Sequence, residues 1–276
     1  NSWRDARELV ITDAVFRDAS VNWVETEKHI KTKIDTSITT IVQGFIAGDL
    51  NGNTTTLGRE GSDFTAGIFA YCLDAESLTI WKDVPGVLNA DPREFEDPQL
   101  LEQISYEETI EMAFYGASVI HPKTIKPIQN KKIPLIVRSF KDLNSKGTKV
   151  TNKAEMIPHI PCYIVKKNQV LVSIASLDFS FIVEENISEI FKLFHKYQLK
   201  VNLIQNSAIS FSVCLDNNLN HFDQLFNEMK VLYNVSFVKN VDLFTVRHFT
   251  ENSLSKIYNL GTSLLSQINK NTAQVI

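Results

Sequence analysis

The sequence has few cysteines and no long apolar run. Its three cysteines, Cys72, Cys162 and Cys214, are odd in number and widely spaced among apolar residues, so they indicate buried thiols rather than a disulfide framework or a metal site. No stretch approaches the roughly 20 apolar residues that a membrane-spanning helix needs, and the first residues do not have the form of a signal peptide. We therefore expect a protein of the reducing cytoplasm without a membrane segment.

The chain also lacks an excess of positive charge. Its formal net charge is -4, with 28 Lys and Arg against 32 Asp and Glu, which argues against nucleic acid or an anionic membrane as the partner. An initiator methionine is absent as well, so we expect a fragment. What is present is 276 residues, 43% of them hydrophobic and 22% charged, enough for two ordered domains.

The stretch LGREGSDFTA at residues 57–66 carries the most suggestive chemistry. Gly58 and Gly61 allow positive φ angles and a close approach to a ligand, and Ser62 is a good N-cap for the apolar helix pattern that follows. The free N–H groups of such a helix start, together with the planar guanidinium of Arg59, suit a carboxylate or a phosphate. The alternative is an ordinary glycine turn capped by serine, and the pattern alone does not separate the two.

Residues 1–152 alternate between helical and strand patterns. Apolar spacing, caps and prolines predict helices over residues 3–10, 25–33, 63–73, 105–116 and 122–130. Runs rich in β-branched residues predict strands over residues 37–46, 77–83 and 133–138, the first of them buried on both faces. This order is typical of an α/β domain with a largely parallel sheet, whose ligands lie at the carboxyl ends of the strands.

Residues 153–276 have a different organisation. A polar stretch with two prolines, over residues 151–161, predicts a linker. Strand and helix patterns over about 168–238 follow the order β-α-β-β-α-β of a ferredoxin-like plait. A second copy, mainly residues 239–276, stops before its unit is complete, so we expect the chain to be cut at both ends.

Three motifs in this order resemble those of the aspartate kinases: TTLGREGSDFTA at residues 55–66, WKDVPGV at 81–87 leading to DPR at 91–93, and GASVIHP at 116–122. The resemblance implies a three-layer amino-acid-kinase (carbamate-kinase-like) α/β domain, incomplete at its N-terminus, followed by tandem ACT regulatory domains. It further implies transfer of the ATP γ-phosphoryl group to the β-carboxylate of L-aspartate, the first step of lysine, threonine and methionine biosynthesis, with Mg²⁺ carried by the nucleotide.

The resemblance also assigns roles at the glycine corner. It places Arg59 on a carboxylate of L-aspartate, and Ser62 and Asp63 beside the same substrate. Asp63 has two possible roles, to accept the substrate ammonium or to hold a lysine, and helix capping is its structural alternative. Arg59 and Asp63 are the expected catalytic residues, and His121 is expected to be structural.

The nucleotide side follows from the other two motifs. The residues implied to contact ATP are Lys82, Asp83, Leu88, Arg93 and Ser118. Three of them depart from the family pattern, because relatives often have Thr at Lys82, Tyr at Leu88 and Lys at Ser118. Our hypothesis is that Lys82 replaces the missing charge at Ser118, in which case its removal raises the Michaelis constant for ATP.

The resemblance implies an amino-acid effector, lysine or threonine, and a homodimer formed through the ACT domains. The expected effector residues are Val183, Asn186, Asn202, Ala208 and Ile209. Lysine-sensitive relatives tend to carry carboxylates at Asn202 and Ala208, which weakens the case for lysine. The neighbouring Glu184 and Glu185 offer substitute charge or form a solvated loop.

Two alternatives stay open: a non-catalytic amino-acid sensor, and a kinase for another acidic amino acid. The retention of Arg59, Asp63, Asp83 and Arg93 favours a kinase. Relatives begin with a Lys-Phe-Gly-Gly loop that the given sequence lacks, so we expect this fragment to be inactive alone.

Overall fold

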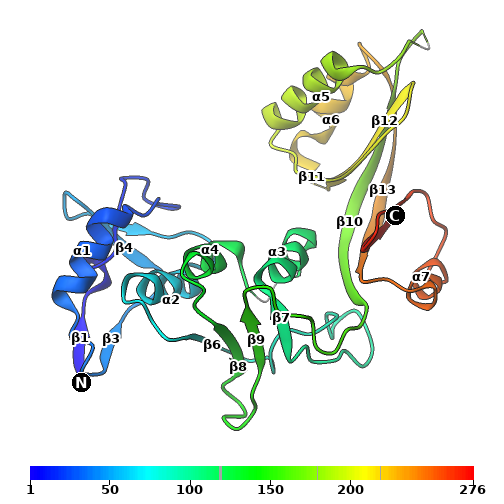
Figure 1. Ribbon diagram of the computed structural model, residues 1–276. Helices are drawn as coiled ribbons and strands as arrows, with labels where there is room; N and C mark the ends of the chain where they lie inside the picture. The colour runs from blue at the N-terminus through cyan, green and yellow to red at the C-terminus, as the bar shows by residue number, and fades with distance from the viewer. Residues whose placement is uncertain (118–119, 179, 218) are drawn as a thin grey trace. The chain divides into compact units, whose positions relative to one another are not determined.

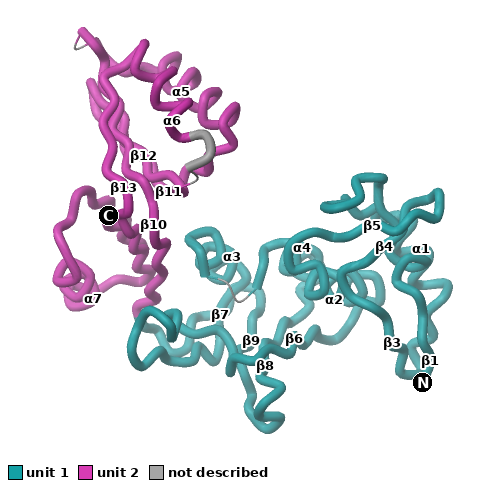
Figure 2. The backbone as a smooth tube through the Cα atoms, turned by 180° about the vertical axis from the view of Figure 1, so that it is seen from behind, with its two compact units in different colours: residues 1–160 teal, residues 161–276 magenta. Residues whose placement is uncertain are grey.

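The computed structural model describes residues 1–117, 120–178, 180–217 and 219–276, and the side chains of 219–221 are excluded from the description. The chain forms two compact units, residues 1–160 and 161–276, which Figure 2 distinguishes by colour. Within the described residues no helix is long and apolar enough to cross a membrane.

Unit 1 combines short strands with four α-helices among its described residues. The helices are α1 (Trp23–Lys33), α2 (Gly61–Cys72), α3 (Tyr106–Tyr115) and α4 (Pro122–Asn130). The strands are β1 (Ser2–Arg4), β2 (Ile11–Thr12), β3 (Thr40–Val42), β4 (Ile46–Asp49), β5 (Thr54–Thr56), β6 (Leu78–Lys82), β7 (Gln103–Ser105), β8 (Leu135–Ser139) and β9 (Thr148–Thr151). They pair in the orders β1-β3, β2-β4-β5 and β6-β8-β9-β7.

Helix α2 is central to unit 1. Its buried face, with Ile68 and Cys72, joins Leu9, Ile30 and Leu57 in one apolar core. Its other neighbour is α4, against which it packs (Figure 1). Gly67 makes this approach possible, since a Cβ atom there would lie 2.9 Å from the carbonyl oxygen of Thr124. Packing against α4 and against the apolar core thus fixes the position of α2 and of its first turn.

Several helix boundaries confirm the sequence signals. Ser105 is the N-cap of α3 and its side chain accepts from the N–H of Glu108, while Gly116 ends that helix with φ 123°. His121 is the N-cap of α4, accepts from the N–H of Lys123 at 3.1 Å, and is followed by proline in the first turn. The structural role expected for His121 is therefore confirmed.

Residues 3–10 do not form the expected helix. They form β1 and a single 3-10 turn, η1 (Ala6–Glu8). The Asp5 side chain accepts from the N–H of Arg7 and starts the turn, but the N–H of Ala6 donates to the Gln43 side chain at 2.9 Å. A tertiary hydrogen bond thus competes with the helix that the apolar spacing favoured.

Residues 37–46 do not form one buried central strand either. The run divides into β3 and β4, and Ile41 is 61% exposed. Phe45, with φ 74°, interrupts the extended backbone between them. The β-branched composition correctly indicated strand conformation, but its interruption depends on contacts from α2 described below.

Unit 2 contains the expected β-α-β-β-α-β order. Its elements are β10 (Cys162–Ala175), α5 (Glu184–Lys196), β11 (Val201–Asn206), β12 (Ser210–Asp216), α6 (Leu219–Met229) and β13 (Asn234–Arg247). The strand order β11-β12-β10-β13 is that of a ferredoxin-like plait. Both helices lie on one face of this sheet in Figure 1, and Ile190, Phe194, Phe222 and Leu225 fill the core beneath them.

The same sheet continues into a second plait, and β10 and β13 run through both. Residues 162–166 of β10 pair with 243–247 of β13, beyond a bulge at Gln169. α7 (Glu251–Tyr258), β14 (Ser266–Ile268) and β15 (Thr272–Val275) follow, and the order β10-β13-β15-β14 repeats that of the first plait. The start of β10 therefore supplies the fourth strand of the second plait, so the first plait is inserted within the second.

Candidate functional site

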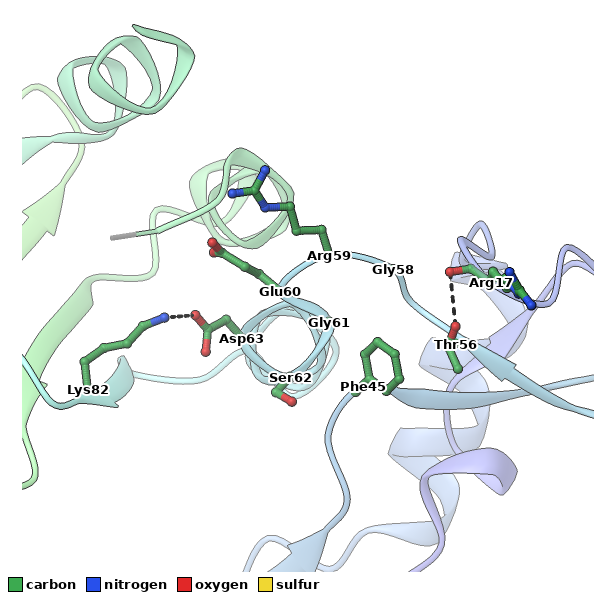
Figure 3. Close-up of a pocket in the computed structure, with 10 residues that line it drawn as sticks. All are labelled: Arg17, Phe45, Thr56, Gly58, Arg59, Glu60, Gly61, Ser62, Asp63 and Lys82. Atoms are coloured by element: carbon green, nitrogen blue, oxygen red, sulfur yellow. Dashed lines mark hydrogen bonds and ion pairs between the residues drawn. The ribbon is translucent and has the colours of Figure 1, made fainter. Parts of the chain in front are cut away.

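A pocket of about 650 Å³ opens at the N-terminal end of α2 (Figure 3). It is formed by the loop before α2, the end of β6 and the residue that precedes β4. The residues that line it are Arg17, Phe45, Thr56, Gly58, Arg59, Glu60, Gly61, Ser62, Asp63 and Lys82. The pocket thus contains the glycine corner that the sequence singled out.

The corner reaches its shape through two residues with positive φ. Gly58 has φ 74°, and a side chain there would collide with the carboxylate of Asp18, which pairs with Lys123 at 2.5 Å. Glu60 has φ 53° and is the N-cap of α2. Because Glu60 rather than Ser62 caps the helix, Ser62 lies inside the first turn, and the prediction that Ser62 is the N-cap was wrong.

Phe45 forms the opposite wall with a strained backbone. Its N–H donates to the Thr65 hydroxyl at 3.0 Å, and that hydroxyl donates to the carbonyl of Gly61 at 2.8 Å. These bonds tie the β3–β4 connection to the first turn of α2. They also hold Phe45 in the left-handed region, which costs an L-residue about 1–2 kcal/mol.

One ion pair lies inside the pocket. Lys82, the last residue of β6, places Nζ 2.7 Å from Oδ2 of Asp63, and the two side chains are 26% and 18% exposed. In Figure 3 the lysine reaches from its strand toward the first turn of α2. This contact matches one of the two roles expected for Asp63, that of holding a lysine.

Arg59 and two backbone N–H groups at the start of α2 are not engaged in this ion pair. Arg59 is exposed and makes no ion pair within the described part of the chain. The N–H groups of Ser62 and Asp63 precede the first intrahelical bond of α2, from Phe64 to Glu60, and so remain available to a ligand. A flexible guanidinium and two bare N–H groups make this end of the pocket suitable for an anion.

Glu60 was not among the expected site residues. Among the described residues its Oε2 atom, which is buried, has no hydrogen-bond partner, and the same is recorded for Asp63 Oδ2 apart from its ion pair with Lys82. Arg17 and Phe45 were not anticipated either, and their segments carried no motif. The available signal for Glu60 was its place between Arg59 and Gly61, where the glycine corner offers a left-handed position.

The expected nucleotide residues are only partly in this pocket. Lys82 lines it, whereas Asp83 is exposed directly after β6 and Leu88 lies at a bridge to Leu100. The guanidinium of Arg93 pairs with Asp91 at 2.6 Å and is largely exposed. Ser118 lies outside the described residues. Asp83, Leu88, Arg93 and Ser118 therefore remain predictions.

Unit 2 has its own cavity of about 280 Å³, at the loop before α5. Asn186, from the first turn of α5, lines it with Phe181 and Tyr233. The N–H of Ile182 donates to the carbonyl of Ala208 at 2.9 Å, which brings the expected effector residues Val183, Asn186, Ala208 and Ile209 into one region.

Asn202 lies elsewhere in the plait. Its amide accepts from Lys166 Nζ at 2.8 Å and donates to Gln169 and Asp216. Burial lowers the pKa of Lys166, and the nearby Lys200 lowers it further. Since β11 rises about 3.3 Å per residue, Asn202 is roughly 13 Å along the strand from Asn206, its last residue, and Ala208 lies in the turn beyond. Within one copy of the chain it is part of a polar network at the β10 bulge.

The described residues contain no group of three or more His, Cys, Asp or Glu side chains able to hold a metal ion. All three cysteines are buried and form no disulfide within the described residues. Burial raises the pKa values of Cys72 and Cys214 to about 12. Burial thus disfavours the thiolate at Cys72 and Cys214, and no cysteine is among the residues that line the pocket.

Comparison with known proteins identifies the class of unit 1. Residues 5–139 match the model of the amino acid kinase family. Lysine-sensitive aspartokinase 3 of Escherichia coli (strain K12) is 39% identical over 176 residues, which cover 64% of this chain and 39% of that protein. A bifunctional aspartokinase/homoserine dehydrogenase of Zea mays is 32% identical over 221 residues, 77% of this chain and 24% of that protein.

Solved structures extend the likeness to both units. The E. coli aspartokinase III structure in complex with lysine and aspartate has a TM-score of 0.79 at 27% identity, covering 99% of this chain and 65% of that one. An aspartate kinase of Clostridium acetobutylicum shares the fold, with a TM-score of 0.85 at 22% identity over 99% of this chain and 66% of its own.

Unit 1 thus has the amino-acid-kinase fold, and its residues 5–139 match the amino acid kinase family. More particularly, the chain is related to the aspartokinases, which confirms the resemblance stated from its motifs. It spans about two fifths of the length of the E. coli relative, so the activity of the whole protein is a matter for proposal.

Proposed function

We propose that the chain is the part of an aspartokinase that holds L-aspartate for phosphorylation of its β-carboxylate by ATP. The observation that supports this best is the pocket at α2, where Arg59, bare helix N–H groups and the Lys82–Asp63 pair lie together. Related solved structures carry aspartate with lysine and aspartate with ADP.

The chemistry needs little from the protein beyond positioning and charge. An ionised carboxylate is already a nucleophile, so the site must bring two anions together and neutralise them. Arg59 would bind a substrate carboxylate through two parallel bonds, and the first turn of α2 would donate its N–H groups. Lys82, held by Asp63, would stand near the transferred phosphoryl group and offset its charge.

The nucleotide is the second proposed ligand, with Asp83, Leu88, Arg93 and Ser118 as its expected contacts. A magnesium ion would arrive with the phosphates, because Mg²⁺ commonly keeps several waters and binds one or two carboxylates plus phosphate oxygens. When bound, the ion would neutralise charge on the phosphates. The residues of this chain would orient the aspartate and exclude water from it.

Unit 2 is the proposed regulatory part. Its cavity before α5, which Asn186 lines, would take an amino-acid effector, lysine or threonine, and the Ile182–Ala208 hydrogen bond keeps Val183, Ala208 and Ile209 in the same region. β11 is an edge of the described sheet, and its unpaired backbone groups would pair with a second copy to form a homodimer. The three buried thiols suit a protein of the cytoplasm.

Titration calorimetry of L-aspartate into the chain tests the proposed substrate. We expect binding that Arg59→Ala weakens by about tenfold or more, the effect of losing a charged bidentate contact. Arg4→Ala, an exposed arginine on β1, is the matched control and should leave binding unchanged. Equal affinity of the wild type and Arg59→Ala for L-aspartate would exclude this pocket as the aspartate site. Binding of L-glutamate in place of L-aspartate would favour a kinase for another acidic amino acid.

A further inference from the structure

Thr65 makes two hydrogen bonds that join different parts of the chain beside the pocket. Its hydroxyl donates to the carbonyl of Gly61, one turn earlier in α2, at 2.8 Å, a bond that threonine commonly makes within a helix. The same hydroxyl accepts the N–H of Phe45, the residue before β4, at 3.0 Å. Thr65 is only 4% exposed. One buried oxygen therefore links the β3–β4 connection to the first turn of α2.

Phe45 depends on this link because its backbone is strained. Its φ of 74° lies in the left-handed region, which a residue with a Cβ atom disfavours. The N–H of Leu57 donates to the Phe45 carbonyl at 2.9 Å, so Thr65 and Leu57 hold the residue from its two peptide groups. The cost of such strain is of the same order as the contribution of one buried hydrogen bond. Loss of the bond from Thr65 should therefore allow the backbone at Phe45 to relax.

A relaxed Phe45 would alter the anion end of the pocket. In Figure 3 its ring lies beside the first turn of α2. The ring is so close to Gly61 that a Cβ atom there would lie 2.7 Å from Cδ2 of Phe45. The next two residues, Ser62 and Asp63, have the bare N–H groups of this end of the pocket. Movement of the connection would displace the wall that faces these groups.

We propose that Thr65 is a positioning residue, whose hydroxyl holds the strained β3–β4 connection against α2 and keeps the anion end of the pocket formed before a ligand binds. Thr65 is not among the residues that line the pocket, so it acts through Phe45 rather than by contact with the ligand. Pre-organisation raises affinity, because the ligand does not have to order the pocket. This inference rests on the proposed aspartate site and adds a determinant of its affinity.

The test is calorimetric titration of L-aspartate into the chain. Thr65→Val keeps the shape of the side chain and removes the hydroxyl, and we expect it to weaken L-aspartate binding by about tenfold. Thr65→Ser, which keeps the hydroxyl, should bind L-aspartate as the wild type does. This rescue distinguishes the hydrogen bonds from the packing of the side chain.

Thr26→Val is the matched control. Thr26, on α1, is fully buried, and its hydroxyl likewise bridges two backbone groups, the N–H and the carbonyl of Ile11, at 2.9 and 3.1 Å. It is not among the residues that line the pocket. Thr26→Val should therefore lower the free energy of unfolding and leave the affinity for L-aspartate unchanged.

A second comparison tests the path through Phe45. Glycine adopts a positive φ without the steric penalty of a Cβ atom. In the Phe45→Gly background, Thr65→Val should therefore weaken L-aspartate binding by about twofold or less, because the two residues are coupled. A loss as large as that in the wild-type background would contradict action through Phe45. This pair also decides the question if Thr65→Val alone does not fold.

Equal L-aspartate affinities of the wild type and Thr65→Val would overturn the inference and leave the aspartate site intact. A loss in Thr26→Val as large as that in Thr65→Val would overturn it as well, because lowered stability then explains both results. Failure of the wild type to bind L-aspartate would exclude the proposed function together with the inference. Urea unfolding followed by tryptophan fluorescence verifies that each variant is folded.

Discussion

The Lys82–Asp63 pair allows a quantitative test of the pocket. At a separation of 2.7 Å, an effective dielectric constant of about 20 gives roughly 6 kcal/mol of gross attraction. Desolvation of two side chains that are only 26% and 18% exposed offsets most of this. We therefore expect a coupling free energy of about 1–3 kcal/mol between the two residues.

The assay is a double-mutant cycle with Asp63→Asn, Lys82→Met and the double variant, unfolded in urea. All three tryptophans, Trp3, Trp23 and Trp81, lie in unit 1, so tryptophan fluorescence reports its unfolding without a signal from unit 2. The double variant should lose less unfolding free energy than the two single variants lose in sum, and the difference is the coupling free energy. A coupling below about 0.5 kcal/mol would refute the reasoning and leave Lys82 free for the nucleotide.

Three further predictions concern other parts of the chain. Phe194, in the core of unit 2, is 1% exposed, and Phe194→Ala should lower the free energy of unfolding of that unit by about 3–5 kcal/mol, as measured by circular dichroism. The unfolding transition seen by tryptophan fluorescence should not change, and a shift of both transitions would contradict this prediction. Cys72 and Cys214, whose pKa values burial raises to about 12, should resist iodoacetamide at pH 8 until urea is added; labelling of the folded chain at the rate seen in urea would contradict this. Hydrogen bonds from Asn53 lower the pKa of Asp49 in the folded chain. The contribution of Asp49 to the free energy of unfolding should therefore be complete above the ordinary carboxyl pKa, and it should be lost as the pH falls through the lower pKa of the folded chain. The difference in unfolding free energy between the wild type and Asp49→Ala should accordingly shrink in acid, and a difference constant with pH would exclude this.

The sequence predicted an element correctly where that element contains its own capping residue or its own apolar face. The Ser105 cap of α3 and the Pro122 start of α4 confirm this, as do the apolar stripes of α5 and α6 that fill the core of unit 2. The insertion of the first plait within the second was not predicted. It depends on the pairing of residues 162–166 with 243–247, about 80 positions apart, and no local pattern encodes such a pairing.

The candidate site shows the same division. The glycine corner and the strand end at Lys82 were predicted from short motifs, and the structure brings Arg59, Ser62, Asp63 and Lys82 into one pocket. The cap at Glu60 was not predicted, because Ser is ordinarily the better N-cap. Its position follows from a left-handed backbone angle that only the folded corner imposes.

The measurement that bears most directly on the proposed function is phosphoryl transfer in a complete protein that contains these residues. ATP and L-aspartate are supplied, and hydroxylamine traps the acyl phosphate as a hydroxamate. We predict hydroxamate from L-aspartate in the wild type and a loss of about a hundredfold or more in Arg59→Ala, where a bidentate charged contact to the substrate is missing. Absence of product in the wild type, or an unchanged rate in Arg59→Ala, would contradict an aspartate kinase site at the start of α2.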